Sequence, residues 1–150
     1  MSQRAGLTSH VVGENCTRLR AQVGMSLRQL ADELRDQADL AITAQSLSAI
    51  ERGNTGVTVD LLTALAVVFS VSPSSLLMPH TDDAIEPLVA LSGVPDTHPL
   101  IMWQWLAGLT PHDSPPEVSR ANLEVVKEFR LRSRPSWVSG EPRNTARKSP

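Results

Sequence analysis

Apolar residues at helical spacing form five short runs between residues 12 and 78, and a cap or turn residue separates each run from the next. The members of the first run recur at intervals of three or four residues, which places them on one side of a helix that Gly24 can close. They are Val12, Cys16, Leu19 and Val23. Five short helices within about eighty residues predict an all-α bundle.

Hydroxyl residues mark the starts of the next four helices. Such a side chain can accept a hydrogen bond from a free backbone N–H group in the first turn, and the four residues are Ser26, Thr43, Thr58 and Ser72. Pro73 follows at the first position of the fifth helix, where proline is favoured. Between the third and fourth helices, residues 54–56 have the composition of a turn. The inward sides of the second and fourth helices are predicted to consist of Leu27, Leu30, Ala31 and Leu34, and of Leu61, Leu62, Leu65, Ala66 and Phe69.

Three segments occur in the order found in a DNA-binding family: RLRAQVGMSLRQLADEL, SLSAIERG and VDLLTALAVVFSVSPSSLL. From about Val12 to Pro79 the chain resembles the helix-turn-helix domain of the Cro/cI-type (Xre-like) repressors. The resemblance implies a five-helix, lambda-repressor-like bundle over residues 10–79, in which Ser26–Leu34 is the positioning helix. It also implies that Thr43–Arg52 is the recognition helix, which enters the major groove with its N-terminal residues toward the bases.

The first turn of this third helix has side chains that suit base readout. Ala44 can meet a thymine methyl group, Gln45 can pair with adenine through two hydrogen bonds, and Ser46 can donate or accept. Free backbone N–H groups and a partial positive charge at the same helix end favour a nearby phosphate. In isolation these residues would also suit a solvated helix start, so the expected DNA contact depends on the family resemblance.

The start of the second helix departs from the family pattern. Leu27 stands where the family usually has a polar residue, often glutamine. We expect the neighbouring Arg28 and Gln29 to take over the positioning contact with the DNA backbone. The residues expected at the DNA interface are therefore Arg28, Gln29, Thr43, Ala44, Gln45, Ser46, Ser48, Ala49 and Arg52.

Arg20 and Glu51 occupy the positions at which the family pairs an arginine of the first helix with the glutamate of the IERG segment. The resemblance implies a structural clamp, in which a partly buried ion pair fixes the angle between two helices. A loose surface pair, contributing about 0 to 1 kcal/mol, is the alternative. Arg52 is expected to contact a phosphate or the C-terminal end of its helix rather than a base.

The segment Arg35–Leu40, RDQADL, adds about six residues to the short turn that the family has before the third helix. Ala38 continues the apolar spacing of the second helix, which is therefore expected to extend by a turn or more. Asp36 and Asp39 would repel phosphates, so we expect the extension to point away from DNA.

The formal charge of −2 is unevenly distributed along the chain. Residues 1–80 have six basic and seven acidic side chains. Residues 81–119 have six acidic side chains and no basic ones, and residues 120–150 have eight basic and three acidic side chains. A surface that binds nucleic acid is expected to be basic, so the last block supports DNA binding and the first does not. The near-neutral first block keeps a second hypothesis open, namely a protein-binding adaptor or antitoxin.

The C-terminal part is predicted to be a small, mainly helical extension. Residues 80–97 combine prolines, turn residues and acidic side chains around PLVALSGV, which indicates a linker or one short strand. Residues 98–134 contain two helical patterns, and the second has on one face Val118, Ala121, Val125 and Phe129. Residues 135–150 are polar and rich in Pro, Ser and Arg, which indicates a disordered basic tail that attracts DNA or only solubilises the chain.

Trp103 and Trp105 lie in the first of these two patterns, PLIMWQWLAG. Side chains two residues apart on a helix point about 200° apart, so the two tryptophans cannot both face one core. Either this helix packs within the chain on several sides, or it forms a dimer interface through Trp103, Trp105 and Leu106.

The remaining residues give little support for catalysis or for the binding of a metal or cofactor. Cys16 is the single cysteine and is expected in the core, and the four histidines lack ligand spacing, so no metal or cofactor is expected. No motif indicates a catalytic triad, a zinc protease or a phosphate-binding loop, which argues against an enzyme. Without a signal-peptide pattern or an apolar membrane span, a cytoplasmic, nucleoid-associated protein is expected.

These observations lead to one principal hypothesis. The chain is predicted to be a sequence-specific, DNA-binding transcriptional regulator, and the family resemblance implies a dimeric repressor of bacterial or phage type that occupies double-stranded operator DNA. The adaptor or antitoxin, with the tryptophan helix as its docking site, is the alternative. Neither the operator sequence nor any small-molecule effector can be identified from the sequence.

Overall fold

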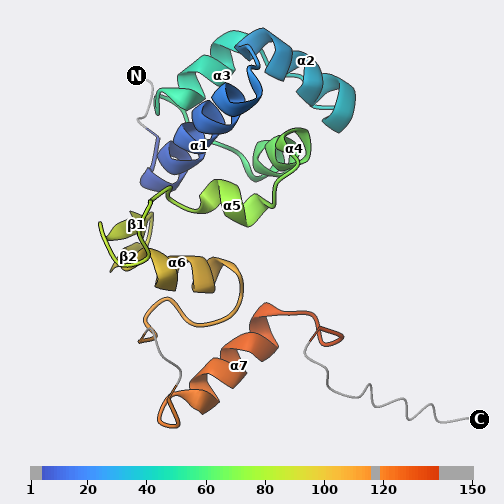
Figure 1. The fold of residues 1–150 in the computed structure, drawn as a ribbon. Helices are drawn as coiled ribbons and strands as arrows, with labels where there is room; N and C mark the ends of the chain where they lie inside the picture. Colours follow the sequence, from blue (N-terminus) through green and yellow to red (C-terminus); the bar gives the residue numbers. More distant parts are fainter. Residues whose placement is uncertain (1–4, 116–118, 139–150) are drawn as a thin grey trace, which may run out of the picture. The chain divides into compact units, whose positions relative to one another are not determined.

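The computed structural model describes residues 5–115 and 119–138, and it divides the chain into two compact units, Met1–Pro99 and Leu100–Pro150. The first unit contains α1 (Leu7–Val23), α2 (Leu27–Ala38), α3 (Ala44–Glu51), α4 (Val59–Phe69), α5 (Pro73–Leu77), β1 (Val89–Leu91) and β2 (Val94–Thr97). Helix α6 (Pro99–Leu106) starts at the boundary, and α7 (Leu123–Ser133) belongs to the second unit (Figure 1). In the described part of the chain, no helix combines the length and apolar composition needed to cross a bilayer.

The helix starts follow from side-chain caps, as predicted. In α2 to α5 the hydroxyl oxygen of the cap residue accepts a hydrogen bond from the backbone N–H three residues later, at 3.1 to 3.2 Å. The predicted caps Ser26, Thr43, Thr58 and Ser72 are thereby confirmed. Gly24 ends α1 in the left-handed conformation, which glycine adopts without the strain of a side chain.

Helix α1 begins about one turn before the predicted apolar stripe, at Leu7. Its N-cap, Gly6, has no side chain to offer. Instead, the Thr8 N–H donates to the Ser92 hydroxyl at 3.2 Å, and the Ser92 N–H donates to the Thr8 hydroxyl at 2.9 Å. A residue 84 positions away in sequence therefore caps α1. The sequence around α1 alone could not predict this cap. At the other end, Val23 is 64% exposed and lies outside the core, contrary to prediction.

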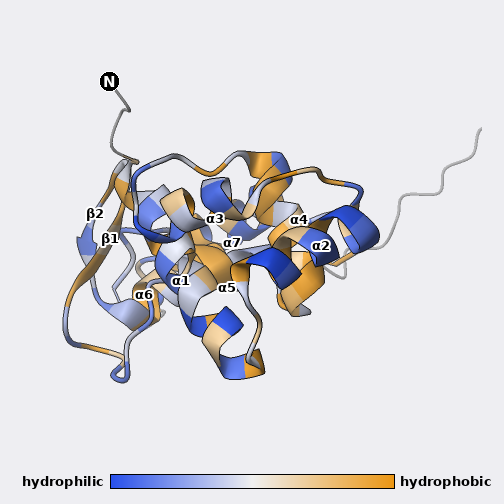
Figure 2. Ribbon diagram, turned by 90° about the horizontal axis from the view of Figure 1, so that it is seen from above, coloured by the Kyte–Doolittle hydropathy of each residue, from blue (hydrophilic) through white to orange (hydrophobic). Residues whose placement is uncertain are grey.

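The core of the first unit is formed by side chains of α1, α2, α3, α4 and α5, and Figure 1 shows the arrangement of these five helices. Helix α4 is apolar along most of its length (Figure 2). The core consists of Val12, Cys16, Leu30, Leu34, Leu47, Ile50, Leu61, Ala64, Leu65, Ala66 and Leu76. Most of the predicted inward positions are buried or half-buried, because helical spacing alone determines which residues share a side.

The expected all-α class is wrong in one respect, because residues 89–97 form an antiparallel hairpin. Ser92 and Gly93 form a two-residue turn between Leu91 and its partner Val94, and Gly93 has a positive φ of 77°. Such a turn needs a residue that tolerates the left-handed region, so the Ser-Gly pair was the overlooked signal. Val89 and Leu91 are buried, and the hairpin packs on α1 within the first unit.

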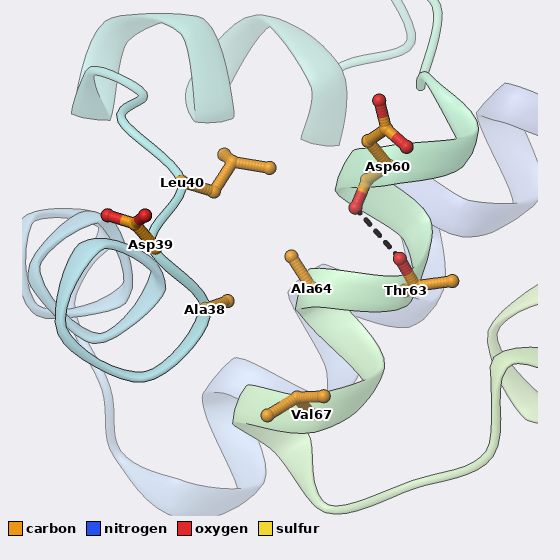
Figure 3. Close-up of a pocket in the computed structure, with 7 residues that line it drawn as sticks. All are labelled: Ala38, Asp39, Leu40, Asp60, Thr63, Ala64 and Val67. Atoms are coloured by element: carbon orange, nitrogen blue, oxygen red, sulfur yellow. Dashed lines mark hydrogen bonds between the residues drawn. The ribbon is translucent and has the colours of Figure 1, made fainter.

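Helix α2 extends to Ala38, as the apolar spacing predicted. Asp39 then adopts a left-handed conformation with a φ of 50°, and the Leu40 N–H donates to the Leu34 carbonyl at 3.1 Å, which closes the helix. The lengthened end of α2 forms one wall of a hollow of about 520 Å³ (Figure 3). The other wall belongs to α4 and consists of Asp60, Thr63, Ala64 and Val67.

In the second unit, one arginine of α7 and the arginine that caps its C-terminal end donate hydrogen bonds to backbone carbonyls after α6. Arg130 Nε donates to the Leu109 carbonyl at 2.8 Å, and Arg134 Nε donates to the Gly108 carbonyl at 3.0 Å. The predicted inward face of the last helix is wrong: Val125 is 57% exposed and Val126 is buried. Since α7 begins only at Leu123, the upstream residues do not set its face. Val118 and residues 139–150 of the predicted basic tail lie outside the described residues.

Candidate nucleic-acid interface

The first turn of α3 is held by its cap and is open on one side. The Thr43 hydroxyl accepts from the Ser46 N–H at 3.1 Å and donates to the Ser46 hydroxyl at 2.9 Å. Gln45 and Ser46 are exposed, and the residues half-buried beside them are Ala44, Ser48 and Ala49. Leu47 and Ile50 are buried in the core. Helix α3 therefore presents one short polar face while its opposite face anchors it.

A groove of about 720 Å³ runs along this polar face. Gln45, Ser46 and Ala49 line one side of it. The loop after α3 and the start of α4 line the other side, through Thr55, Gly56, Thr58 and Asp60. The structure thus brings four of the residues expected to contact DNA to one concave surface, namely Thr43, Gln45, Ser46 and Ala49.

The structure joins Arg20 and Glu51 in a bidentate ion pair between α1 and α3. Arg20 Nε lies 2.8 Å from Glu51 Oε1, and Arg20 Nη2 lies 2.8 Å from Glu51 Oε2. Arg20 Nη1 also donates to the Met25 carbonyl at 2.9 Å. The two side chains are only 22% and 9% exposed, so the contact is not a loose surface pair. The hydrogen bonds that Arg20 donates to the Glu51 carboxylate raise the pKa of Arg20, which keeps the guanidinium charged.

The other polar residues expected at the interface differ in whether their side chains hydrogen-bond to the protein itself. Arg28 is exposed. Gln29 is exposed as well, but its side-chain oxygen accepts from the Ser26 N–H at 2.8 Å and completes a capping box. Arg52 folds back onto its own helix, where its Nε donates to the Ser48 carbonyl at 3.3 Å. Arg28 and Arg52 are both exposed and basic, as a phosphate contact requires.

Two residues that position α3 and α5 were missing from the predicted site. Gly13 of α1 faces the backbone carbonyl of Ile50, and a Cβ atom there would overlap that oxygen. Asn15 is buried, and its Nδ2 donates to the Leu76 carbonyl at 2.9 Å and to the Met78 carbonyl at 2.8 Å. Neither residue belongs to a sequence motif. A glycine and an asparagine inside an apolar helical run were the available signals.

The two tryptophans of α6 point in different directions, as helical geometry requires. Trp103 is 52% exposed, whereas Ile101 and Met102 are buried. Trp105 is half-buried and makes an edge-on contact with the ring of His112, with centroids 6.1 Å apart. Leu106 is half-buried. Of the three residues proposed for a dimer interface, Trp103 is the one that presents a large apolar surface.

Reactive or metal-binding chemistry has little support in the described part of the chain. No group of three or more His, Cys, Asp or Glu residues there could hold a metal ion. Cys16 is 2% exposed, and burial raises the pKa of its thiol to about 12. A thiol in this environment is inert as a nucleophile, because the reactive thiolate is not formed near neutral pH.

Comparison with known proteins assigns the class of this domain. Residues 18–76, from the middle of α1 to α5, match the family model described as helix-turn-helix. This match supports the Xre-like, Cro/cI-type helix-turn-helix family for residues 18–76. Domains of this family bind DNA in transcription regulators and are not enzymes. No curated protein and no solved structure gives a significant match to the chain.

Proposed function

We propose that the protein is a dimeric repressor that reads operator DNA with the first turn of α3. The observation that carries this proposal is the exposed face of Gln45 and Ser46, which lies along a groove on a helix otherwise anchored in the core. Gln45 can pair with adenine in bidentate fashion, Ser46 can donate or accept, and Ala44 and Ala49 leave room for thymine methyl groups. Such a regulator would act at the nucleoid, in the cytoplasm.

The contacts behind α3 supply the rigidity that base readout requires. A hydrogen bond to a base edge tolerates only a few tenths of an ångström and a limited range of angles. The Arg20–Glu51 ion pair and the close approach of Gly13 to Ile50 both connect α3 to α1. These contacts keep the orientation of α3 fixed while its exposed side enters the major groove.

Dimerisation is the part of the proposal that concerns the second unit. One helix-turn-helix reads only a few base pairs, and dimers of this class read two half-sites about one helical turn apart. Joining two domains raises the apparent affinity roughly a hundredfold or more without a new base contact. Trp103 is a large apolar side chain with half of its surface exposed, which suits a contact with a second copy.

One observation favours a second candidate, a protein-binding adaptor or antitoxin. The first 80 residues have six basic and seven acidic side chains, and the groove along α3 contains no basic side chain among the described residues that line it. Phosphate attraction is therefore weak on this face. In this alternative the exposed Trp103 would dock a partner protein rather than a second copy.

Selection of DNA from a random pool distinguishes the two candidates. The purified full chain is mixed with random duplexes, and the retained fragments are sequenced. A two-fold symmetric enriched sequence supports the dimeric repressor, because the symmetry of the site reflects the symmetry of the protein. Lack of any enriched sequence contradicts the repressor and favours the adaptor.

A further inference from the structure

The groove along α3 contains a carboxylate that base readout does not use. Asp60 is the second residue of α4, is exposed, and lines the same groove as Gln45 and Ser46. Figure 3 shows its carboxylate pointing away from Leu40 and Ala64, which line the neighbouring hollow. The charge is therefore directed away from the interior of that hollow.

Among the described residues, no basic side chain lines the groove beside this carboxylate. The groove lining includes no lysine, arginine or histidine there, and the Asp60 side chain makes no ion pair or hydrogen bond with a described residue. Only its backbone carbonyl has a side-chain partner, the Thr63 hydroxyl, at 3.1 Å (Figure 3).

A carboxylate in such a groove has two chemical roles open to it. It can accept a hydrogen bond from the N4 amino group of cytosine, or it can repel a phosphate. Asp60 stands on the wall of the groove, on α4, and its side chain is short. Its place in the first turn of α4 is also where free backbone N–H groups would otherwise attract a phosphate. These features favour repulsion of phosphate.

We propose that Asp60 determines specificity by repelling phosphates at the start of α4, which weakens binding to DNA that lacks the operator sequence. This inference rests on the proposed function. On an operator, base contacts of α3 fix how the domain docks, and they outweigh one unfavourable charge. On other DNA, phosphate attraction supplies nearly all of the affinity, and a domain can settle wherever that attraction is strongest. Asp60 makes one of these docking positions unfavourable for a phosphate, so the repulsion weakens mainly the non-specific binding.

The test compares two charge-neutralising variants of the full chain, Asp60→Asn and Asp39→Asn. Asp39 is the matched control, because it is exposed near Asp60 but lines the hollow and not the groove. Asparagine also tolerates the positive φ of residue 39. Fluorescence anisotropy measures binding to the selected operator and to a scrambled duplex of the same composition, at several salt concentrations. Thermal midpoints verify that both variants are folded.

Asp60→Asn is expected to bind the scrambled duplex about threefold to tenfold more tightly, with less than about twofold change on the operator. The slope of log affinity against log salt should become steeper by up to about one for the scrambled duplex. Asp39→Asn should change both affinities by less than about twofold. The ratio of operator to scrambled affinity then falls only in the Asp60 variant.

Three results would overturn the inference. An equal gain in both variants would mean that net charge alone matters. Weaker operator binding by Asp60→Asn would identify a base-contacting acceptor. Unchanged binding to the scrambled duplex would show that no phosphate lies near residue 60. Failure of the proposed function looks different, because the wild-type chain would then show no preference for any duplex.

Discussion

Gly13 in α1 lies directly against the backbone carbonyl of Ile50 in α3, and no side chain fits between the two helices at this point. The contact lies behind the exposed turn that carries Gln45, and it adjoins the Arg20–Glu51 ion pair between the same two helices. The position of α3 is therefore set from its buried side.

Substitution of Gly13 by alanine should destabilise the fold. The added methyl group would overlap the Ile50 carbonyl, which is backbone and cannot move aside independently. We expect a loss of about 1 to 3 kcal/mol in the free energy of unfolding, measured by urea denaturation. Gly56→Ala is the control, because a Cβ atom there would meet only the Ser9 hydroxyl, at an ordinary 3.7 Å. Equal stabilities of the two variants would show that the helices are not so close.

Glu51→Ala should lower stability more than it alters DNA sequence preference. The substitution leaves Arg20 half-buried without its bidentate partner, which costs about 3 kcal/mol in the free energy of unfolding. Glu124→Ala, which removes an exposed i,i+3 pair with Lys127, should cost less than about 1 kcal/mol. A Glu51 variant with wild-type stability and a changed binding motif would place this residue among the base contacts instead.

Cys16 should be unreactive toward thiol reagents in the folded protein. At pH 8 we expect labelling at least about a hundredfold slower than in urea, because the thiol is buried and its pKa is about 12. Since folding raises this pKa from 9.0, the folded state keeps the proton where the unfolded state loses it. The resulting stability is present below pH 9 and is lost as the pH rises toward 12.

The alkaline loss can be isolated by comparison with Cys16→Ala. Between pH 9 and 10.5 the wild-type chain should lose about 1 to 2 kcal/mol more than this variant in urea denaturation. Identical pH dependence in the two proteins, or rapid labelling of the native thiol, would contradict a buried Cys16.

Trp103→Glu should weaken self-association of the full chain. A charge placed at the exposed tryptophan would have to be buried in the proposed interface, which is costly without a partner. Sedimentation should show dimers of the wild-type chain and of Trp137→Glu, since Trp137 is exposed but lies outside α6. A wild-type chain that is monomeric at concentrations where it binds its operator would exclude this dimer.

Local chemistry made much of the first unit predictable. The caps Ser26, Thr43, Thr58 and Ser72 act through a hydrogen bond to a residue three positions away, and apolar spacing acts over one or two turns. The Arg20–Glu51 contact, in contrast, was expected from the family resemblance and not from spacing. Its partners are 31 residues apart, and nothing local pairs them.

The features that sequence reading missed depend on distant parts of the chain. Ser92 caps α1, and Asn15 donates to carbonyl groups at the C-terminal end of α5, in both cases across more than 60 residues. The Ser92-Gly93 turn was locally visible, but the short strands beside it could not be distinguished from a linker by composition. The charge of Asp60 was counted in the first block, and only the structure places it on the groove along α3.

The central claim is that the first turn of α3 reads base sequence, and Gln45→Ala tests it most directly. Gln45 is exposed, so its removal should leave the thermal midpoint nearly unchanged. Gln22→Ala, at an exposed site near the end of α1, is the control. Random-pool selection with Gln45→Ala should show relaxed preference at one base pair in each half-site, and about 1 to 3 kcal/mol weaker binding to the wild-type operator. The same enriched motif and affinity as the wild-type chain would contradict the claim.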